Sequence, residues 1–221
     1  MIEVKELNKK YGKTTVLSNI NITFNAGHTY GVMGENGAGK STLFRCIMRL
    51  EGYDGKIEIT KGLNVGYLPD TPYFYSLVTG MEFIEFCLKA RGLKIDYNEI
   101  DAVNDLFRLP LNRFPSSYSM GMRKRLVLMI LILQHSDYYI LDEPFNGLDL
   151  AGSILLKKWI LRMKADGKMV VLSSHIISSL TDICDEITYI HAGNIVGTYR
   201  GLSAEEIEKD ITTNFITDTV F

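Results

Sequence analysis

The sequence predicts an α/β fold in which a core sheet is flanked by helices, with an N-terminal antiparallel β region and an inserted helical subdomain. Strand-like segments dominate residues 2–33, helical spacing replaces them over about 75–134, and strands alternate with helices again from residue 135. With 221 residues, 46% of them apolar, the chain can bury a substantial core. We predict one domain over 1–221, whose core comprises about 1–74 and 135–221.

The first part of the chain is predicted to be mainly β structure. The expected elements are short strands over 2–25, a strand over 29–33, a helix over 40–49, and edge strands or hairpins over 55–67. Leu43, Ile47 and Leu50 stand at helical spacing, which supports the helix. The result is a strand, a glycine-rich loop and a helix in succession.

The rest of the chain is predicted to be helical first and then mixed. The expected elements are helices over 81–91, 97–109 and 121–133, strands over 138–143, 169–175 and 186–193 with helices between them, and a short final helix. Gly92 and Pro110 follow or end the first two helices. Ser203 with Glu206 forms a capping box that starts the final helix, whereas the structure of residues 211–221 stays open.

Composition excludes several classes of protein. The formal net charge of −2 argues against nucleic acid as a partner, which would favour a basic excess. The three cysteines are far apart and odd in number, so a reducing compartment is expected. The chain start lacks the pattern of a secretion signal, and the longest apolar run, 126–133, is well below the roughly 20 residues of a spanning helix. We therefore expect a cytoplasmic protein that reaches a membrane only through a partner.

The segment Gly34–Ser41, GENGAGKS, matches the phosphate-loop pattern G-x-x-x-x-G-K-[ST] between a predicted strand and a predicted helix. It predicts a P-loop NTPase core. Backbone N–H groups and the helix start favour a triphosphate, Lys40 is expected to reach the outer phosphates, and the Ser41 hydroxyl to bind Mg²⁺. The other expected nucleotide contacts are Gly34, Asn36, Gly37, Ala38, Gly39 and Thr42. The alternative is a glycine-rich turn with a solvated lysine.

A second motif is the apolar strand of YYILDEP, which ends in Asp142 and Glu143 before Pro144. In a protein with a phosphate loop, the first carboxylate can hold Mg²⁺ and the second can activate the water that attacks the γ-phosphate. We assign these roles to Asp142 and Glu143 respectively. The alternative is a pair of solvated acids at a turn, which Lys40 upstream makes less favourable.

Taken in order, the motifs resemble an ATP-binding-cassette (ABC) transporter ATPase over essentially the whole chain. They are GENGAGKS, then YSMGM at 118–122, YYILDEP, the loop 146–149, and His175 after MVVLSS. A signature-like turn about twenty residues before an acidic strand end is highly specific to this family. Met122, where most members have glutamine, is similar to drug- and polysaccharide-exporting members, and this favours export.

The resemblance implies further site residues. Tyr11 takes the place of the aromatic that stacks on adenine, although it could be an ordinary turn tyrosine. Ser119 and Gly121 belong to the signature, which contacts the γ-phosphate of ATP on the other subunit; Ser119 could also be a helix N-cap. Asp149 matches the aspartate that crosses the dimer, and His175 matches the histidine that senses the γ-phosphate and joins Glu143 and Lys40 in catalysis.

One departure from the family concerns the metal. Asp70 stands where the family has a glutamine that binds Mg²⁺. An aspartate is shorter and charged, so it could approach the metal through water, and direct binding is not expected. The basic triplet Arg123–Arg125 is expected to be a solvated face, with the alternative that one residue helps hold the opposing nucleotide.

The function implied by the resemblance is ATP hydrolysis to ADP and phosphate, with ATP and Mg²⁺ as cofactors, by a head-to-tail homodimer. The expected partner is an integral membrane permease at the inner face of the cell membrane, touched near Asp70 and the helices over 75–91. The alternatives are a soluble ABC-type ATPase that acts on nucleic acid or the ribosome, which usually has tandem cassettes or a basic appendage, and a non-hydrolysing protein, which would tend to lack Glu143. The transported substrate is not encoded in this chain.

Overall fold

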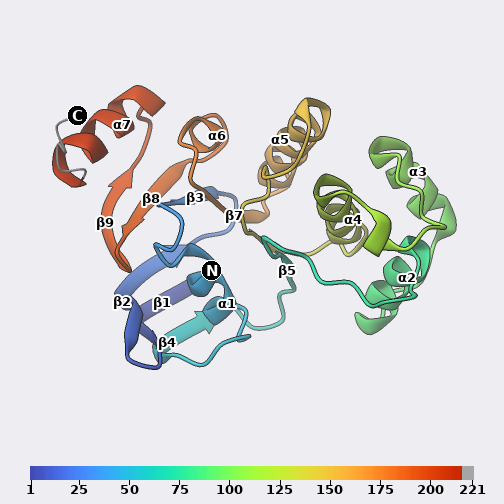
Figure 1. Ribbon diagram of the computed structural model, residues 1–221, viewed down its shortest axis with the longest axis horizontal. Helices are drawn as coiled ribbons and strands as arrows, with labels where there is room; N and C mark the ends of the chain where they lie inside the picture. The colour runs from blue at the N-terminus through green and yellow to red at the C-terminus, as the bar shows by residue number, and fades with distance from the viewer. Residues whose placement is uncertain (216–221) are drawn as a thin grey trace.

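The computed structural model describes residues 1–215, and its elements are shown in Figure 1. In chain order they are β1 (Ile2–Tyr11), β2 (Thr14–Phe24), β3 (Thr29–Met33), α1 (Lys40–Ile47), β4 (Asp54–Ile59), β5 (Val65–Leu68), α2 (Gly80–Ala90), α3 (Tyr97–Phe107), the 3-10 turn η1 (Pro115–Ser117), α4 (Met120–Leu133), β6 (Tyr138–Leu141), α5 (Leu150–Ala165), β7 (Met169–Ser174), α6 (Ser178–Thr181), β8 (Glu186–His191), β9 (Asn194–Tyr199) and α7 (Ala204–Phe215).

Two sheets form the centre of the molecule. The first is antiparallel, with strand order β2-β1-β4. The second has the order β5-β6-β7-β3-β8-β9, in which only β9 runs antiparallel to its neighbour. This arrangement confirms the predicted α/β fold with an N-terminal antiparallel region.

The C-terminal part differs from the prediction in two respects. The expected strand over 186–193 is followed by a further strand, β9, and Ala192 and Gly193 with positive φ form the turn between them. The final helix α7 has 12 residues, more than the short helix expected. It includes the first residues of the undecided segment 211–221, whose residues 216–221 lie outside the part described.

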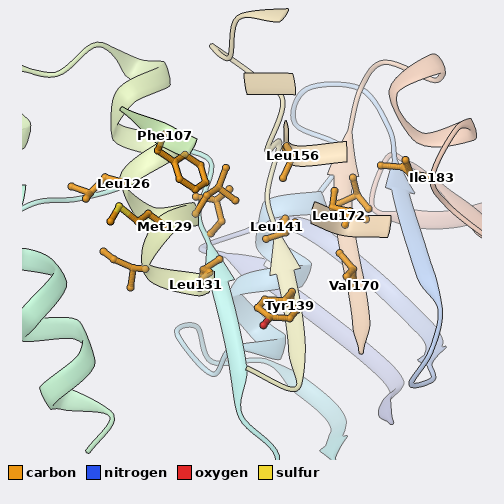
Figure 2. Close-up of a cluster of buried hydrophobic side chains, with 14 of the residues drawn as sticks. Phe107, Leu126, Met129, Leu131, Tyr139, Leu141, Leu156, Val170, Leu172 and Ile183 are labelled. Carbon is orange, nitrogen blue, oxygen red and sulfur yellow. The ribbon is translucent and has the colours of Figure 1, made fainter. Parts of the chain in front are cut away.

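Strands β3, β6 and β7 are buried along their whole length, because helices or the antiparallel sheet cover both faces of the second sheet. On one face, Leu126 and Met129 of α4 belong to the same apolar cluster as Leu141 of β6 and Leu172 of β7 (Figure 2). A second cluster lies between the antiparallel sheet, α1 and the opposite face. These two clusters fix the parallel strands relative to the helices on one face and to the antiparallel sheet on the other.

Helices α2, α3 and α4 lie together at the end of the sheet next to β5, drawn in green in Figure 1. A capping box of Thr79 and Glu82 starts α2, Asp96 caps α3, and Ser119 caps α4. The capped helix starts therefore agree with the sequence to within about two residues.

One sequence-based expectation is wrong in this region. The basic triplet Arg123–Arg125 was expected to be a solvated face, but the side chain of Lys124 is fully buried. Gly121, Lys124 and Leu128 are all buried positions of α4, at helical spacing. The buried side of α4 therefore places the Lys124 ammonium group in the interior of the protein.

Candidate functional site

The register of the parallel strands gathers the site. Leu141 of β6 is paired with Leu172 of β7, and Met33 of β3 is paired with Ser174 of β7. The chain beyond each strand therefore leaves the sheet at the same edge. Since β7 lies between β6 and β3, the end of β7 stands between the acidic strand end and the phosphate loop.

The phosphate loop joins β3 to α1 and depends on glycine at two positions. Gly39 has φ of +110° immediately before α1, a conformation that residues with a Cβ rarely adopt. At Gly34, an added Cβ would lie only 2.4 Å from the carbonyl oxygen of Ile190. The loop borders a cavity of about 310 Å³, lined by Val16, Asn36, Gly37, Gly39, Lys40, Ser41, Thr42, Arg45, Asp70, Glu143 and Asn146.

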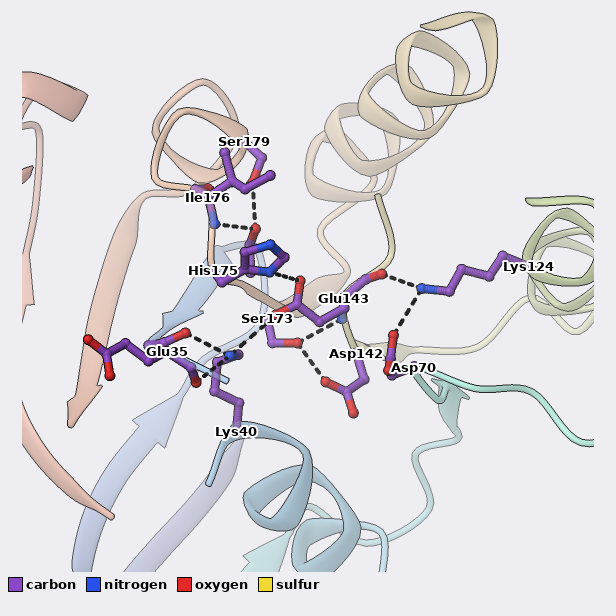
Figure 3. Close-up of polar contacts among 12 residues, drawn as sticks. Glu35, Lys40, Asp70, Lys124, Asp142, Glu143, Ser173, His175, Ile176 and Ser179 are labelled. Carbon is purple, nitrogen blue, oxygen red and sulfur yellow. Dashed lines mark hydrogen bonds and ion pairs between the residues drawn. The ribbon is translucent and has the colours of Figure 1, made fainter. Parts of the chain in front are cut away.

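Lys40, the first residue of α1, is almost fully buried and lines this cavity. Its Nζ donates to the carbonyl oxygens of Gly34 at 2.7 Å and Glu35 at 3.1 Å. It also lies 3.3 Å from Oε1 of Glu143. The structure thus joins the loop lysine to the acidic strand end, as Figure 3 shows.

Asp142 and Glu143 share a partner that the sequence did not identify, Ser173 at the end of β7. The Ser173 hydroxyl donates to Oδ1 of Asp142 at 2.7 Å and accepts the backbone N–H of Glu143 at 2.8 Å. Burial raises the pKa of the Asp142 carboxyl above its ordinary value, although hydrogen bonds from Ser173 and Ser41 act in the opposite direction. Asp142 is thus a buried acid beside the Ser41 hydroxyl.

Glu143 is held by both its backbone and its side chain. Its φ is +45°, an uncommon left-handed conformation for a residue other than glycine. Oε2 lies 3.0 Å from Nδ1 of His175 (Figure 3), while Oε1 is buried and has no hydrogen bond to any described residue. One carboxylate oxygen is therefore oriented by His175, and the other faces Lys40.

The residues present fit a magnesium ion. The buried Asp142 carboxylate and the Ser41 hydroxyl offer adjacent hard oxygen donors, and a cation there would offset the burial that raises the pKa of Asp142. Over residues 1–215, no group of three or more His, Cys, Asp or Glu side chains converges on one point. Mg²⁺ commonly binds through one or two carboxylates plus substrate phosphates, so such a cluster is not required.

The signature residues form a separate group. Ser119 caps α4 and accepts the backbone N–H of Met122 at 3.2 Å, and Gly121 packs against the carbonyl of Gly147. Asp149 caps α5 and pairs with Arg125, which holds the pKa of this carboxyl below its usual range. Ser119, Gly121 and Asp149 do not line the cavity that contains Lys40. Within one subunit, these three residues therefore lie outside the lining of the cavity that contains the phosphate loop.

Tyr11 and Asp70 adjoin the cavity in different ways. The hydroxyl of Tyr11 accepts a long 3.5 Å hydrogen bond from Arg45, which lines the cavity, and its ring is partly exposed. Asp70 lines the cavity itself, with its Oδ1 3.2 Å from Nζ of Lys124. The suggestion that Asp70 binds the metal stays a prediction.

The remaining predicted residues surround these groups. Gly34, Asn36 and His175 border a neighbouring cavity of about 340 Å³, and Ala38 is buried in the core. The sequence analysis assigned no role in this cavity to Val16, Arg45 and Asn146, which line it, or to Lys124 and Ser173, which contact Glu143. The sequence marks only their places: Ser173 stands near the end of the strand before His175, and Lys124 is at helical spacing from Gly121 and Leu128. The contacts that these two residues make depend on the tertiary structure.

A phosphate loop after one parallel strand and paired carboxylates after another define a P-loop nucleotide-binding protein. The ABC transporter family model matches residues 17–146. The ABC-type transporter ATP-binding protein EcsA of Bacillus subtilis is 33% identical over 211 residues, which cover 88% of this chain and 85% of EcsA. The bacitracin transport ATP-binding protein BcrA of Enterococcus faecalis is 32% identical over 210 residues, covering 89% of this chain and 68% of BcrA.

A solved structure of an ATP-binding subunit of an ABC transporter superposes with a TM-score of 0.86 at 29% identity, covering 96% of this chain and 99% of that one. The chain belongs to the ABC transporter family. It is an ATP-binding subunit of that family and an ATPase. The recognition of the family from its motifs is confirmed.

Proposed function

We propose that this protein uses Glu143 to activate the water that attacks the γ-phosphate of ATP. The observation that supports this most directly is the contact of one carboxylate with both His175 and Lys40, at 3.0 Å and 3.3 Å. A general base needs a fixed position within reach of the proton that it removes. Glu143 has that fixed position, and its Oε1 retains acceptor capacity toward the cavity.

The other residues of the cavity bind the substrate in this proposal. Gly34, Asn36, Gly37, Ala38, Gly39 and Thr42 form the loop around the phosphates, and Tyr11 provides the surface for the base. Lys40 exchanges its carbonyl contacts for the outer phosphates, where its charge opposes the charge that develops during transfer. Ser41 and Asp142 would hold Mg²⁺, which supplies charge neutralisation of the phosphates when bound.

The substitution Glu143→Gln tests the role of the base, because it preserves size and removes the charge. We expect turnover to fall by about 10²- to 10⁴-fold, a typical contribution of a general base. Binding of a fluorescent ATP analogue should change by less than about threefold. Turnover equal to that of the unchanged protein would contradict the proposal.

We further propose that two copies assemble head to tail, so that each nucleotide is completed by Ser119, Gly121 and Asp149 of the other copy. Within one subunit these residues do not line the cavity that contains Lys40, which supports this arrangement. Ser119 also begins α4, where free backbone N–H groups and the helix dipole favour a phosphate. Specific turnover should rise with protein concentration through the dimerisation range; a concentration-independent rate below that range would contradict the homodimer.

Coupling to transport requires a membrane partner in this proposal. No helix within residues 1–215 has the length and apolarity to cross a membrane. Large apolar side chains, including Leu77, are exposed between β5 and α2 and on α2 itself. The ring of Tyr75 contacts the ring of Tyr73 at a centroid distance of 5.7 Å and the ring of Phe86 at 5.9 Å. Such a patch is typical of a protein interaction site. We propose that an integral membrane protein docks there and places this subunit at the inner face of the cell membrane.

Copurification tests the partner surface. A double substitution, Tyr75→Ser with Phe86→Ser, should remove the membrane protein that copurifies from detergent-solubilised native material, while the matched control Leu202→Ser, an exposed leucine before α7, should not. Equal recovery of the partner with both variants would contradict this docking surface.

We favour export as the direction of transport because of Met122 in the signature.

A further inference from the structure

The buried ammonium of Lys124 is the feature of the site that neither the motifs nor the family assignment explains. Its Nζ donates to the backbone carbonyl of Glu143 at 2.6 Å and to Oδ1 of Asp70 at 3.2 Å (Figure 3). Burying a charge is costly unless the charge is paired and hydrogen-bonded. Lys124 meets both requirements through these two residues.

The hydrogen bond from Lys124 to the Glu143 carbonyl stabilises an unfavourable backbone conformation of Glu143. A residue with a side chain at φ of +45° persists only where its surroundings impose that conformation. On one side of Glu143, the N–H donates to Ser173 at 2.8 Å; on the other side, the carbonyl accepts from Lys124 at 2.6 Å and from the N–H of Asn146 at the longer distance of 3.2 Å. These contacts fix the backbone from which the carboxylate reaches His175 and Lys40, and the bond from Lys124 is the shortest and the only charged one among them.

Asp70 is the second partner of the Lys124 ammonium and lies on a different segment from Glu143. It follows β5, in the segment that leads to the exposed aromatic side chains, and it is about half exposed. Its carboxylate is the acidic partner of the buried ammonium, whose own side chain is fully buried. Asp70, Lys124 and Glu143 therefore join the segment after β5, helix α4 and the end of β6 through one charged group.

We propose that Lys124 is a positioning residue for Glu143 and that Asp70 acts on the reaction through Lys124, an inference that rests on the proposed role of Glu143 as the base. The Asp70–Lys124 ion pair holds α4 at the acidic strand end and keeps the Glu143 carbonyl turned toward it. Loss of the pair releases the backbone of the base without removing any group that contacts ATP.

The substitution Lys124→Met tests this role, with Lys157→Met as the matched control, because Lys157 of α5 forms a partly exposed ion pair with Asp182 away from the cavity. We expect Lys124→Met to lower kcat by about 10- to 100-fold, the size of effect that small misplacements of catalytic groups produce. The dissociation constant of a fluorescent ATP analogue should change less than about threefold. Lys157→Met should leave both quantities unchanged.

Combination with Glu143→Gln separates positioning from general loss of structure. If Lys124 acts through Glu143, Lys124→Met should lower the turnover of the Glu143→Gln variant by less than about twofold, because residues that act as one unit are not additive. A full additional loss, or wild-type kcat in Lys124→Met alone, would overturn the inference. Wild-type turnover in Glu143→Gln would instead overturn the proposed base, so the two failures are distinguishable.

Asp70→Asn supplies the second, independent variant and serves if Lys124→Met does not fold. We expect a loss of kcat of about 3- to 10-fold that disappears in the Glu143→Gln background, with an unchanged Mg²⁺ concentration at half-maximal rate. If Asp70 were instead a metal ligand, Asp70→Asn would raise that Mg²⁺ concentration. This result, or an undiminished loss of kcat in the Glu143→Gln background, would overturn the inference.

Discussion

Replacing Gly121 by alanine should destabilise the protein, because the start of α4 touches the loop before α5 backbone to backbone. A Cβ added at Gly121 would lie 2.3 Å from the carbonyl oxygen of Gly147, whereas such contacts are essentially never shorter than 3.0 Å. The helix start and the loop must therefore separate by about 0.7 Å. No change of rotamer can absorb this displacement, since both contacting atoms belong to the backbone or are fixed to it.

The magnitude follows from the balance of two effects. Overpacking of this kind costs about 1–3 kcal/mol, while the higher helix propensity of alanine returns at most about 1 kcal/mol. The centres of these estimates leave a net loss of about 1 kcal/mol, which corresponds to a decrease in melting temperature of about 2–4 °C for a chain of this size. Turnover should fall as well, because α4 carries Arg125 and Lys124 away from Asp149 and Glu143.

Thermal unfolding of Gly121→Ala and of the matched variant Gly52→Ala measures the effect. Gly52 is exposed, has no positive φ, and an added Cβ there would meet nothing within 4 Å. Its replacement should leave stability unchanged or increase it by about 0.4–1 kcal/mol by restricting the unfolded chain. A melting temperature of Gly121→Ala equal to that of Gly52→Ala would refute the argument from close contact.

Three further predictions concern single contacts. Asp149→Ala removes the N-cap of α5 and should lower stability by about 1 kcal/mol in denaturant unfolding, whereas Asp149→Asn retains a capping oxygen and should lose less; equal losses would contradict the capping role. Ser173→Ala leaves the Glu143 N–H and Asp142 without their shared partner and should cost about 1–3 kcal/mol, whereas the exposed Ser117→Ala should cost little; no difference between the two would argue against the shared hydrogen bond. The Asn64 N–H, followed by Lys168, lowers the pKa of the Asp137 carboxyl, so its stabilising contribution is present above the ordinary carboxyl pKa and is lost as pH falls through the lower folded value. Asp137→Asn should therefore flatten the acid side of the curve of stability against pH, below about pH 4, and an unchanged slope would count against this reasoning.

Much of the fold was predictable because its signals are local. The glycine loop between a strand and a helix, the capping box at Ser203, and the runs of apolar residues in β6 and β7 each specify an element within a few residues. The strand β9 was missed although Ile195, Val196 and Tyr199 favour strands, because Gly197 interrupts this short run. The division into core and helical subdomain stays a prediction.

The site was predictable only in part. Lys40, Asp142, Glu143 and His175 were chosen from motifs, and the structure brings Lys40, Glu143 and His175 into direct contact. The roles assigned to these residues stay predictions. Ser173 was not found, because its two contacts depend on β7 lying between β6 and β3, and strand order is not visible in a list of segments.

The sequence by itself determined the family, the phosphate loop and the identity of the acidic pair, because these depend on residue types at fixed short spacing. Only the tertiary structure decided where Lys124 and Asp70 lie, since their contacts join residues 54 and 19 positions apart. It also decided that Ser119 and Gly121 do not line the cavity that contains Lys40 in one subunit. Contacts between distant segments depend on the packing of whole elements, which short patterns in the sequence do not specify.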